Sequence, residues 1–414
     1  MLISSVVHAE IELNIDDETS IKNAAATIAY DMMTYYKGNQ SGGIPGVFTW
    51  TSTKSYLGLL LVGIWRNVGD SYRLLRGENV DMMPANWSQS MGNDDQGFWG
   101  MTAMSAAETK FPDPPAGSPG WLALAQAVFN TQAVRIDNTT CNGGVSLRWQ
   151  VYPYLTGYTY KNSIANGCFF NIGARLARYT NNATYADYAE LTWEWVKNVG
   201  YMDEKYNIYD GAHIDENCAA TMYNYTNGSA IWEERVKGLL NATFTNFFPT
   251  DQIAYEIACE AKLSCTTDMF SFKAYLTRWL AATTKMAPFT YDLIMPYLKA
   301  SAVAAAKQCN GPSPFNDRTC GLSWIKGTNW DGTYGVGQQM AAMSAIFVNL
   351  VQKTQAPVTN STGGTSVGNS AAGSSSTTTL DAVKPPSTGD RVGAGMVTTV
   401  VLVGMTGMFG WMSL

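Results

Sequence analysis

Apolar positions recur with the period of an α-helix along most of the chain between residues 18 and 353, and few stretches alternate with the two-residue period of a strand. Loops rich in glycine, proline, asparagine and aromatic residues separate the apolar stripes. The pattern predicts helices at residues 19–37, 54–74, 94–109, 119–135, 163–179, 183–198, 213–224, 229–247, 268–284, 291–308 and 335–353.

About eleven helices, joined alternately by short and long loops, predict an all-α domain over residues 18–354. Paired in sequence, such helices favour an (α/α)6 barrel, a ring of six helical hairpins. A multi-helix bundle is the alternative. No exact repeat is visible in the sequence, which disfavours a solenoid.

The two ends of the chain differ from this domain. Residues 1–17 contain a short apolar run and then Val7-His8-Ala9, which predicts a truncated signal remnant and an N-terminal arm; an ordinary frayed terminus is the alternative. Residues 355–390 are rich in serine, threonine and glycine, which predicts a disordered linker. Residues 391–414 end in an uncharged apolar tail, which favours a GPI-attachment signal over a retained membrane-spanning helix.

Charged residues are scarce, and the types that are present limit the kinds of catalysis that the chain could perform. They make up 14% of the chain, the net charge is −6, and no basic block is present, so nucleic acid is not an expected partner. The two histidines, His8 and His213, leave little material for a Ser-His-Asp triad or a histidine-rich metal site. We therefore expect chemistry based on carboxylates, with no metal and no cofactor. His213 has no evident catalytic partner and is expected to be structural.

The seven cysteines lack C-x-x-C spacing, which argues against a metal site. Two pairs bracket short polar loops and predict local disulfides: Cys259–Cys265 and Cys309–Cys320. Cys168 lies in the apolar stripe of a predicted helix and is the expected free thiol. Cys141 and Cys218 would then pair over a long range.

Eight Asn-x-Ser/Thr sequons indicate a secreted glycoprotein, in which glycans would solvate a surface poor in charge. The predicted glycosylation sites are Asn39, Asn86, Asn138, Asn182, Asn224, Asn227, Asn241 and Asn360.

Two adjacent carboxylates, Asp94 and Asp95, stand at a predicted helix start. One interpretation is helix capping, with Asn93 as N-cap and Gln96 in the capping-box position. The other is a pair of catalytic acids for glycosidic chemistry.

Four long loops combine tryptophan, tyrosine, glycine, asparagine and aspartate, a composition suited to sugars because rings cover C–H faces and polar groups bind hydroxyls. The candidate substrate-binding residues are Trp99, Arg148, Trp149, Gln150, Asp210 and Trp330. Each tryptophan could equally be a core residue, and Arg148 could be the partner of a buried acid.

These residues resemble the fungal members of glycoside hydrolase family 76, GPI-anchored proteins similar to mannan endo-1,6-α-mannosidases. The matching stretches are Asn93-Asp94-Asp95-Gln96 with Phe98-Trp99, Arg148-Trp149-Gln150, Asn166-Gly167-Cys168-Phe169-Phe170 leading to Ala174-Arg175-Leu176-Ala177, and Tyr209-Asp210-Gly211. One departure is that Val145-Ser146 intervene where the family runs Gly-Gly-Leu-Arg-Trp-Gln.

The resemblance implies an (α/α)6 barrel with the aspartates at the bottom of a groove, Asp94 as nucleophile and Asp95 as general acid/base of a retaining mechanism. Burial beside Trp99 and the charge of Asp94 are expected to raise the pKa of Asp95. The implied donor is mannan or the glycan core of a GPI anchor, and the acceptor is water or wall glucan. The implied location is the outer face of the plasma membrane, through a GPI anchor, or the cell wall. The rival hypothesis is a non-catalytic, mannan-binding wall glycoprotein with the same fold.

Overall fold

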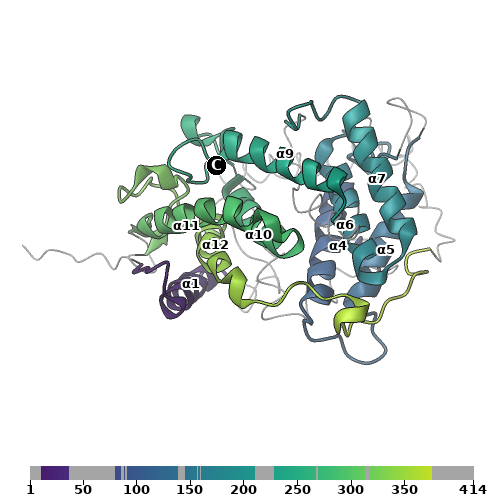
Figure 1. Ribbon diagram of the computed structural model, residues 1–414, viewed down its shortest axis with the longest axis horizontal. Helices are drawn as coiled ribbons and strands as arrows, with labels where there is room; N and C mark the ends of the chain where they lie inside the picture. Colours follow the sequence, from purple (N-terminus) through teal and green to yellow (C-terminus); the bar gives the residue numbers. More distant parts are fainter. Residues whose placement is uncertain are drawn as a thin grey trace, which may run out of the picture.

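The computed structural model describes residues 11–36, 80–84, 88, 91–138, 145–155, 157–158, 160–209, 228–266, 269–312 and 318–374. Figure 1 shows their helices, which are α1 (Glu18–Met33), α4 (Asn93–Glu108), α5 (Trp121–Val134), α6 (Ser163–Thr180), α7 (Ala183–Asn198), α9 (Ala230–Phe247), α10 (Phe272–Met286), α11 (Tyr291–Lys307) and α12 (Val336–Phe347). Within this part of the chain the strands are β1 (Cys309–Gly311) and β2 (Thr319–Cys320), an antiparallel pair. The predicted all-α class is confirmed.

Most helices begin and end within a few residues of the predicted bounds, and the differences have local causes. Helix α1 ends at Met33, where the Thr34 hydroxyl bonds to the Asp31 carbonyl at 2.6 Å and competes with continuation of the helix. Helix α12 tightens into a 3-10 helix at Val348–Lys353. The helices predicted at 54–74 and 213–224 lie outside the described residues.

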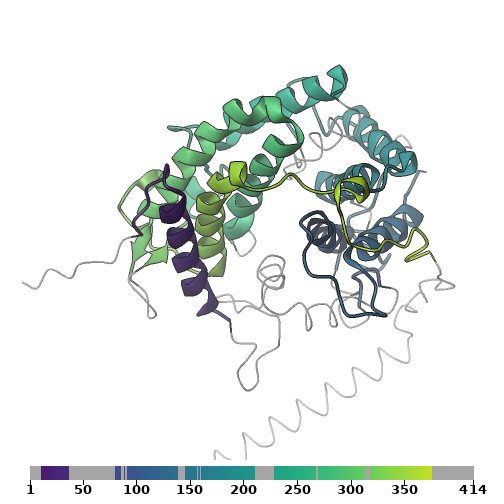
Figure 2. The same cartoon turned by 60° about the horizontal axis from the view of Figure 1, so that its bottom comes forward.

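Helices that follow one another in sequence pack together in space. Helix α4 packs on α5 and α6 on α7, while α11 lies against α10 and α12. The ring of Phe244 on α9 stacks on Tyr297 of α11, with centroids 3.9 Å apart. Helix α1 runs along α12, so the first and last helices meet, and Figure 2 shows the described helices arranged around a ring.

Helix α4 is held by close packing along its length. A Cβ added at Gly97 would lie 2.6 Å from Cys168 Cβ on α6, and one added at Gly100 would lie 2.7 Å from Ile172 Cδ1. At its last residue, Glu108 forms a buried ion pair of 2.8 Å with Arg175 of α6. The helix that carries the two aspartates is therefore fixed against its neighbour at many points.

The segment after α12 extends the folded surface beyond the predicted boundary at residue 354. The Val358 N–H donates to the Glu108 carbonyl at 2.9 Å, and the Leu122 N–H donates to Ser366 Oγ at 2.9 Å. The Asn369 N–H donates to Gln126 Oε1 at 2.7 Å. The linker predicted from residue 355 is thus packed on the barrel as far as Ser374, because its polar groups meet those of α4 and α5. The predicted GPI signal lies outside the described residues.

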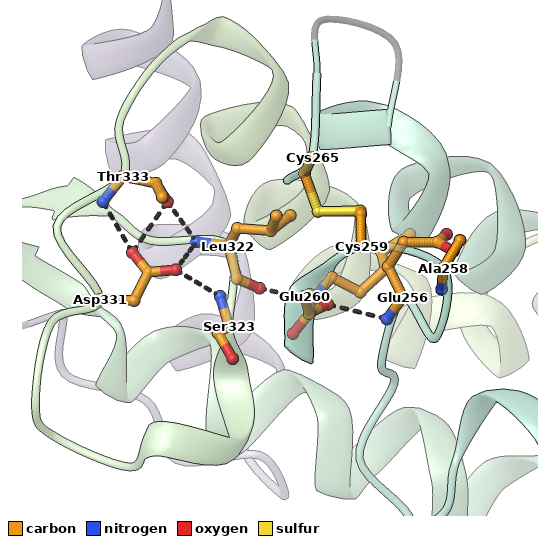
Figure 3. Close-up of a disulfide and its surroundings, with 10 residues drawn as sticks. Glu256, Ala258, Cys259, Glu260, Cys265, Leu322, Ser323, Asp331 and Thr333 are labelled. Carbon is orange, nitrogen blue, oxygen red and sulfur yellow. Dashed lines mark hydrogen bonds and ion pairs between the residues drawn. A yellow bond between two sulfur atoms is a disulfide. The ribbon is translucent and has the colours of Figure 1, made fainter. Parts of the chain in front are cut away.

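Both predicted local disulfides are present, Cys259–Cys265 and Cys309–Cys320. Figure 3 shows the first of them beside Glu260. Lys273 at the start of α10 binds Glu260 at 2.7 Å and also donates to the Leu322 carbonyl, and so joins the loop before α10 to the loop before α12.

Cys168 is buried in α6. Cys141 and Cys218 lie outside the described residues, so the pairing of these three cysteines stays a prediction. No helix in the described part of the chain is long and apolar enough to cross a bilayer.

Candidate active site

The first turn of α4 presents the two adjacent carboxylates, and both are partly exposed. The helix begins at Asn93 and its N-cap is Gly92, one residue earlier than the capping interpretation predicted. Asp95 Oδ2 accepts a hydrogen bond of 2.8 Å from the Gly92 N–H, the role expected of Gln96. Gln96 is buried instead, with Nε2 donating to the Asp81 carbonyl at 2.7 Å.

The segment around Trp149 runs alongside this turn. Gly92 and Gln150 form an antiparallel bridge, and the Asn93 N–H donates to the Trp149 carbonyl at 2.9 Å. The Trp149 indole Nε1–H donates to Asp94 Oδ2 at 3.0 Å, and the Asp95 N–H donates to Asp94 Oδ1 at 3.0 Å. Both oxygens of Asp94 are therefore held by hydrogen bonds. The indole of Trp149, predicted to bind substrate, contacts the carboxylate itself.

Burial, and next to it the charge of the neighbouring Asp95, raise the pKa of Asp94 to about 7, although the Asp95 N–H and the Trp149 indole oppose this shift. The raised pKa expected for Asp95 stays a prediction, and the structure shows a raised pKa for its neighbour Asp94. Because the two carboxyls interact, the proton lost near neutral pH belongs to the pair. Below that pH the pair retains a proton.

Two glycines that the sequence analysis did not single out make room for this geometry. A Cβ on Gly92 would lie 2.4 Å from Asp94 Oδ1 and 2.9 Å from the Trp149 carbonyl oxygen. Gly157, with φ of 95°, lies against the Trp149 ring, where a Cβ would be 2.4 Å from Cε3. No motif in the sequence marks either glycine, because the contacts arise between distant segments.

Arg148 forms an ion pair of 2.6 Å with Asp137, and Lys161 contacts the same carboxylate at 3.3 Å. Its alternative interpretation as the partner of a buried acid is therefore the one that matches the contacts. Ser146, where the chain departs from the family pattern, is buried and bridges Lys161 Nζ at 3.0 Å and the Asp137 carbonyl at 3.2 Å. The departure is integrated into the structure of this loop.

For the remaining substrate-binding candidates in the described ranges, the structure describes no contact with the two carboxylates. Trp99 lies one turn after Asp95 and packs partly buried against the core. Gln150 Oε1 is buried, and no residue in the described ranges donates a hydrogen bond to it. Trp330 covers Gly311 and donates to the Thr333 carbonyl at 3.0 Å, and no described contact links it to the carboxylates.

Asp210 and His213 lie outside the described residues, as do Asn39, Asn86, Asn224 and Asn227. The other four sequon asparagines, Asn138, Asn182, Asn241 and Asn360, are exposed, as glycosylation requires. Within the described ranges no group of three or more His, Cys, Asp or Glu could hold a metal ion.

The model of glycosyl hydrolase family 76 matches residues 20–361. The chain belongs to this family. It is 41% identical to the protein named mannan endo-1,6-alpha-mannosidase DCW1 of Saccharomyces cerevisiae, covering 97% of this chain and 95% of the relative. It is also 42% identical to mannan endo-1,6-alpha-mannosidase DFG5 of Saccharomyces cerevisiae, over 97% of this chain and 94% of that relative.

Solved structures of family members have the same fold as this chain. The crystal structure of Dfg5 from Chaetomium thermophilum in complex with glucosamine is 44% identical, with a TM-score of 0.77 over 87% of this chain and 97% of that chain. The GH76A alpha-1,6-mannanase of Salegentibacter sp. HEL1_6 is 12% identical, with a TM-score of 0.57 over 80% and 99%, and shows the shared fold. The predicted family and (α/α)6 fold are confirmed.

Proposed function

We propose that this protein is a retaining enzyme that acts on α-1,6-mannose linkages, with Asp94 as nucleophile and Asp95 as general acid/base. The observation that carries the proposal is the first turn of α4. Its two carboxylates are adjacent and partly exposed, and Asp94 has a raised pKa and is held by hydrogen bonds to both of its oxygens. The names of the relatives support the choice of linkage.

The adjacency of the two aspartates in the sequence favours retention over inversion. Retaining enzymes hold their carboxyls about 5–5.5 Å apart, whereas an inverting pair leaves about 6.5–9.5 Å for a water molecule. Neighbouring residues on one helical turn reach the shorter spacing easily. Their position at a helix N-terminus also stabilises the carboxylate that must be ionised.

In the proposed cycle, Asp94 attacks the anomeric carbon while protonated Asp95 gives its proton to the leaving glycosidic oxygen. The C1–O bond breaks as the Asp94–C1 ester forms. In the second step Asp95, now a carboxylate, takes a proton from water or from a sugar hydroxyl, and that oxygen displaces Asp94 from C1. Water gives hydrolysis and a sugar hydroxyl gives transglycosylation.

Mannan or the glycan core of a GPI anchor would be the donor, and wall glucan the acceptor when transfer occurs. The apolar tail at residues 391–414 supports a GPI anchor, which would place the enzyme at the outer face of the plasma membrane or in the wall. We assign Arg148 a structural role in its own loop, through its ion pair with Asp137, rather than a role in substrate binding. Gln150 stays a candidate for substrate binding, since a sugar hydroxyl could donate to its buried Oε1.

Isosteric variants test the proposal. Asp94→Asn and Asp95→Asn should each lower turnover of α-1,6-mannotriose by about a hundredfold to ten-thousandfold, the usual contribution of such a group. Asp187→Asn, at an exposed acid on α7, is the matched control and should keep full activity. If both active-site variants turn over like the wild type, the carboxylates only cap the helix and the non-catalytic glycoprotein is the better account. Mass spectrometry of the products formed in the presence of a glucan oligosaccharide distinguishes transfer from hydrolysis.

A further inference from the structure

Arg135 connects the end of α5 to the start of α4. It is the C-cap of α5, and its Nη1 donates to Asn93 Oδ1 at 2.9 Å and to Gln96 Oε1 at 2.7 Å. Asn93 and Gln96 immediately precede and follow the two carboxylates. One guanidinium nitrogen therefore binds both residues that flank the pair.

The first of these partners, Asn93, forms further hydrogen bonds. Its Nδ2 donates to the Arg148 carbonyl at 2.8 Å, its N–H donates to the Trp149 carbonyl, and its own carbonyl accepts from Gln132 Nε2 at 2.7 Å. The chain of contacts from Arg135 thus continues through Asn93 to the backbone of Trp149, whose indole holds Asp94.

The second partner, Gln96, is fixed from its other end. Its Nε2 donates to the carbonyl of Asp81, a buried residue that reaches this site from before α4. With Oε1 bound to Arg135 and Nε2 bound to Asp81, the amide of Gln96 has one orientation that satisfies both contacts. Arg135 therefore ties the first turn of α4 to α5, to the Trp149 segment and to the segment around Asp81.

The electrostatics point to an effect on position rather than on charge. Burial lowers the pKa of Arg135, and the Asp81 charge opposes this shift. Arg135 is not among the groups that shift the pKa of Asp94. A guanidinium taken from water is costly unless it is well bonded, so its value here lies in the geometry it imposes.

We propose that Arg135 is a positioning residue for the reaction: through Asn93 and Gln96 it holds Asp94 and Asp95 in the relative placement that catalysis needs. The inference rests on the proposed function, since the reaction is its main readout. A misplacement of about 1 Å at reacting groups can cost about a hundredfold in rate, so loosening this turn should show in kcat.

The test is Arg135→Lys, which keeps the charge and loses the planar group that reaches two amide oxygens. The matched control is Arg178→Lys. Arg178 is another partly buried arginine whose pKa burial lowers, and it supports the opposite end of α4 through Glu108 at 3.9 Å and the Val358 carbonyl at 3.5 Å. Both variants should lose some thermal stability.

On α-1,6-mannotriose, Arg135→Lys should lower kcat by about tenfold to a hundredfold with KM within about twofold, while Arg178→Lys keeps both constants. In a background of Asn93→Ala the Arg135→Lys effect should shrink, because the link is already broken. A crystal structure of Arg135→Lys gives a readout that does not need turnover: the 3.0 Å contact between Trp149 Nε1 and Asp94 Oδ2 should lengthen.

Unchanged kcat and an unchanged contact in Arg135→Lys would overturn the inference, as would an equal loss of kcat in Arg178→Lys. These outcomes differ from failure of the proposed function, in which the wild type itself does not turn over any α-1,6-mannoside. In that case the crystallographic contact still decides whether Arg135 positions Asp94.

Discussion

The hydrogen bond from the Trp149 indole to Asp94 offers the sharpest perturbation of the site. The bond is 3.0 Å long and stabilises the ionised carboxylate, so it opposes the burial that raises the pKa of Asp94 to about 7. Trp149→Phe removes the N–H and keeps an aromatic ring against Gly157 and Tyr160. The pKa of Asp94 should therefore rise.

The size of the shift follows from the bond. Hydrogen bonds to charged groups contribute about 1.5–3 kcal/mol, and one pKa unit corresponds to about 1.4 kcal/mol, so complete loss would raise the pKa by about 1–2 units. Asp94 is partly exposed, and water will replace part of the bond. We expect a net rise of about half a unit to one unit.

The assay is the pH dependence of kcat/KM on α-1,6-mannotriose. The active pair carries one proton, so activity should fall on the alkaline side near the pKa of about 7, and in Trp149→Phe this limb should move to higher pH. The maximum should also be lower because Asp94 is less well held. Trp330→Phe, which loses an indole bond to the Thr333 carbonyl on another loop, is the control and should leave the profile unmoved. An alkaline limb that stays in place in Trp149→Phe, or moves to lower pH, would refute the reasoning.

Three further predictions concern other features. Gly92→Ala should abolish most activity, since its Cβ would lie 2.4 Å from Asp94 Oδ1, whereas Gly167→Ala on α6, with no atom within 4 Å of the added Cβ, should be tolerated; an active Gly92→Ala enzyme would contradict the geometry. Asp94 has a folded-state pKa above its unfolded value of 3.8, so its ionisation destabilises the fold as pH rises from about 4 through 7. As pH rises from 4 to 8, the free energy of unfolding of Asp94→Asn should therefore increase by about 1–3 kcal/mol relative to that of the wild type. A difference in melting temperature that does not change with pH would show that the raised pKa is wrong. Removing the Cys309–Cys320 disulfide with paired serines should cost about 2–3 kcal/mol in chemical denaturation, and an unchanged midpoint would argue against the bond.

The helices could be predicted because each buries one apolar face and therefore repeats with the helical period. Helix α7 was placed at its observed bounds, Ala183–Asn198, where Asn182 caps the first turn by accepting from the Thr184 N–H at 3.0 Å. The short-range disulfides could also be predicted, since two cysteines a few residues apart on one loop have little else to reach. Composition does not show that the polar segment after residue 354 packs on the barrel, because Val358 and Ser366 bond to helices that lie far away in the sequence.

The candidate acids can be picked out from the sequence, whereas the residues that support them cannot. Asp94 and Asp95 stand out as adjacent acids in a chain poor in charge. Gly92, Arg135 and Gln132 act through contacts between distant segments, and no pattern along the chain marks them. The sequence predicts a raised pKa for Asp95, from burial beside Trp99 and from the charge of Asp94. The raised pKa of Asp94 could not be predicted, because its burial depends on the Trp149 segment, which is distant in the sequence.

The most direct test of the central claim is to trap the glycosyl-enzyme. A slow α-mannosyl fluoride substrate, carrying fluorine beside the anomeric carbon, would be incubated with the enzyme, and peptide mass spectrometry would then locate any sugar attached to the chain. The proposed mechanism predicts one mannosyl adduct on Asp94, which is absent in Asp94→Asn and released by water or by an added sugar acceptor. Full occupancy of the site by ligand without an adduct on either aspartate would contradict a retaining mechanism, and an adduct on Asp95 would reverse the assigned roles.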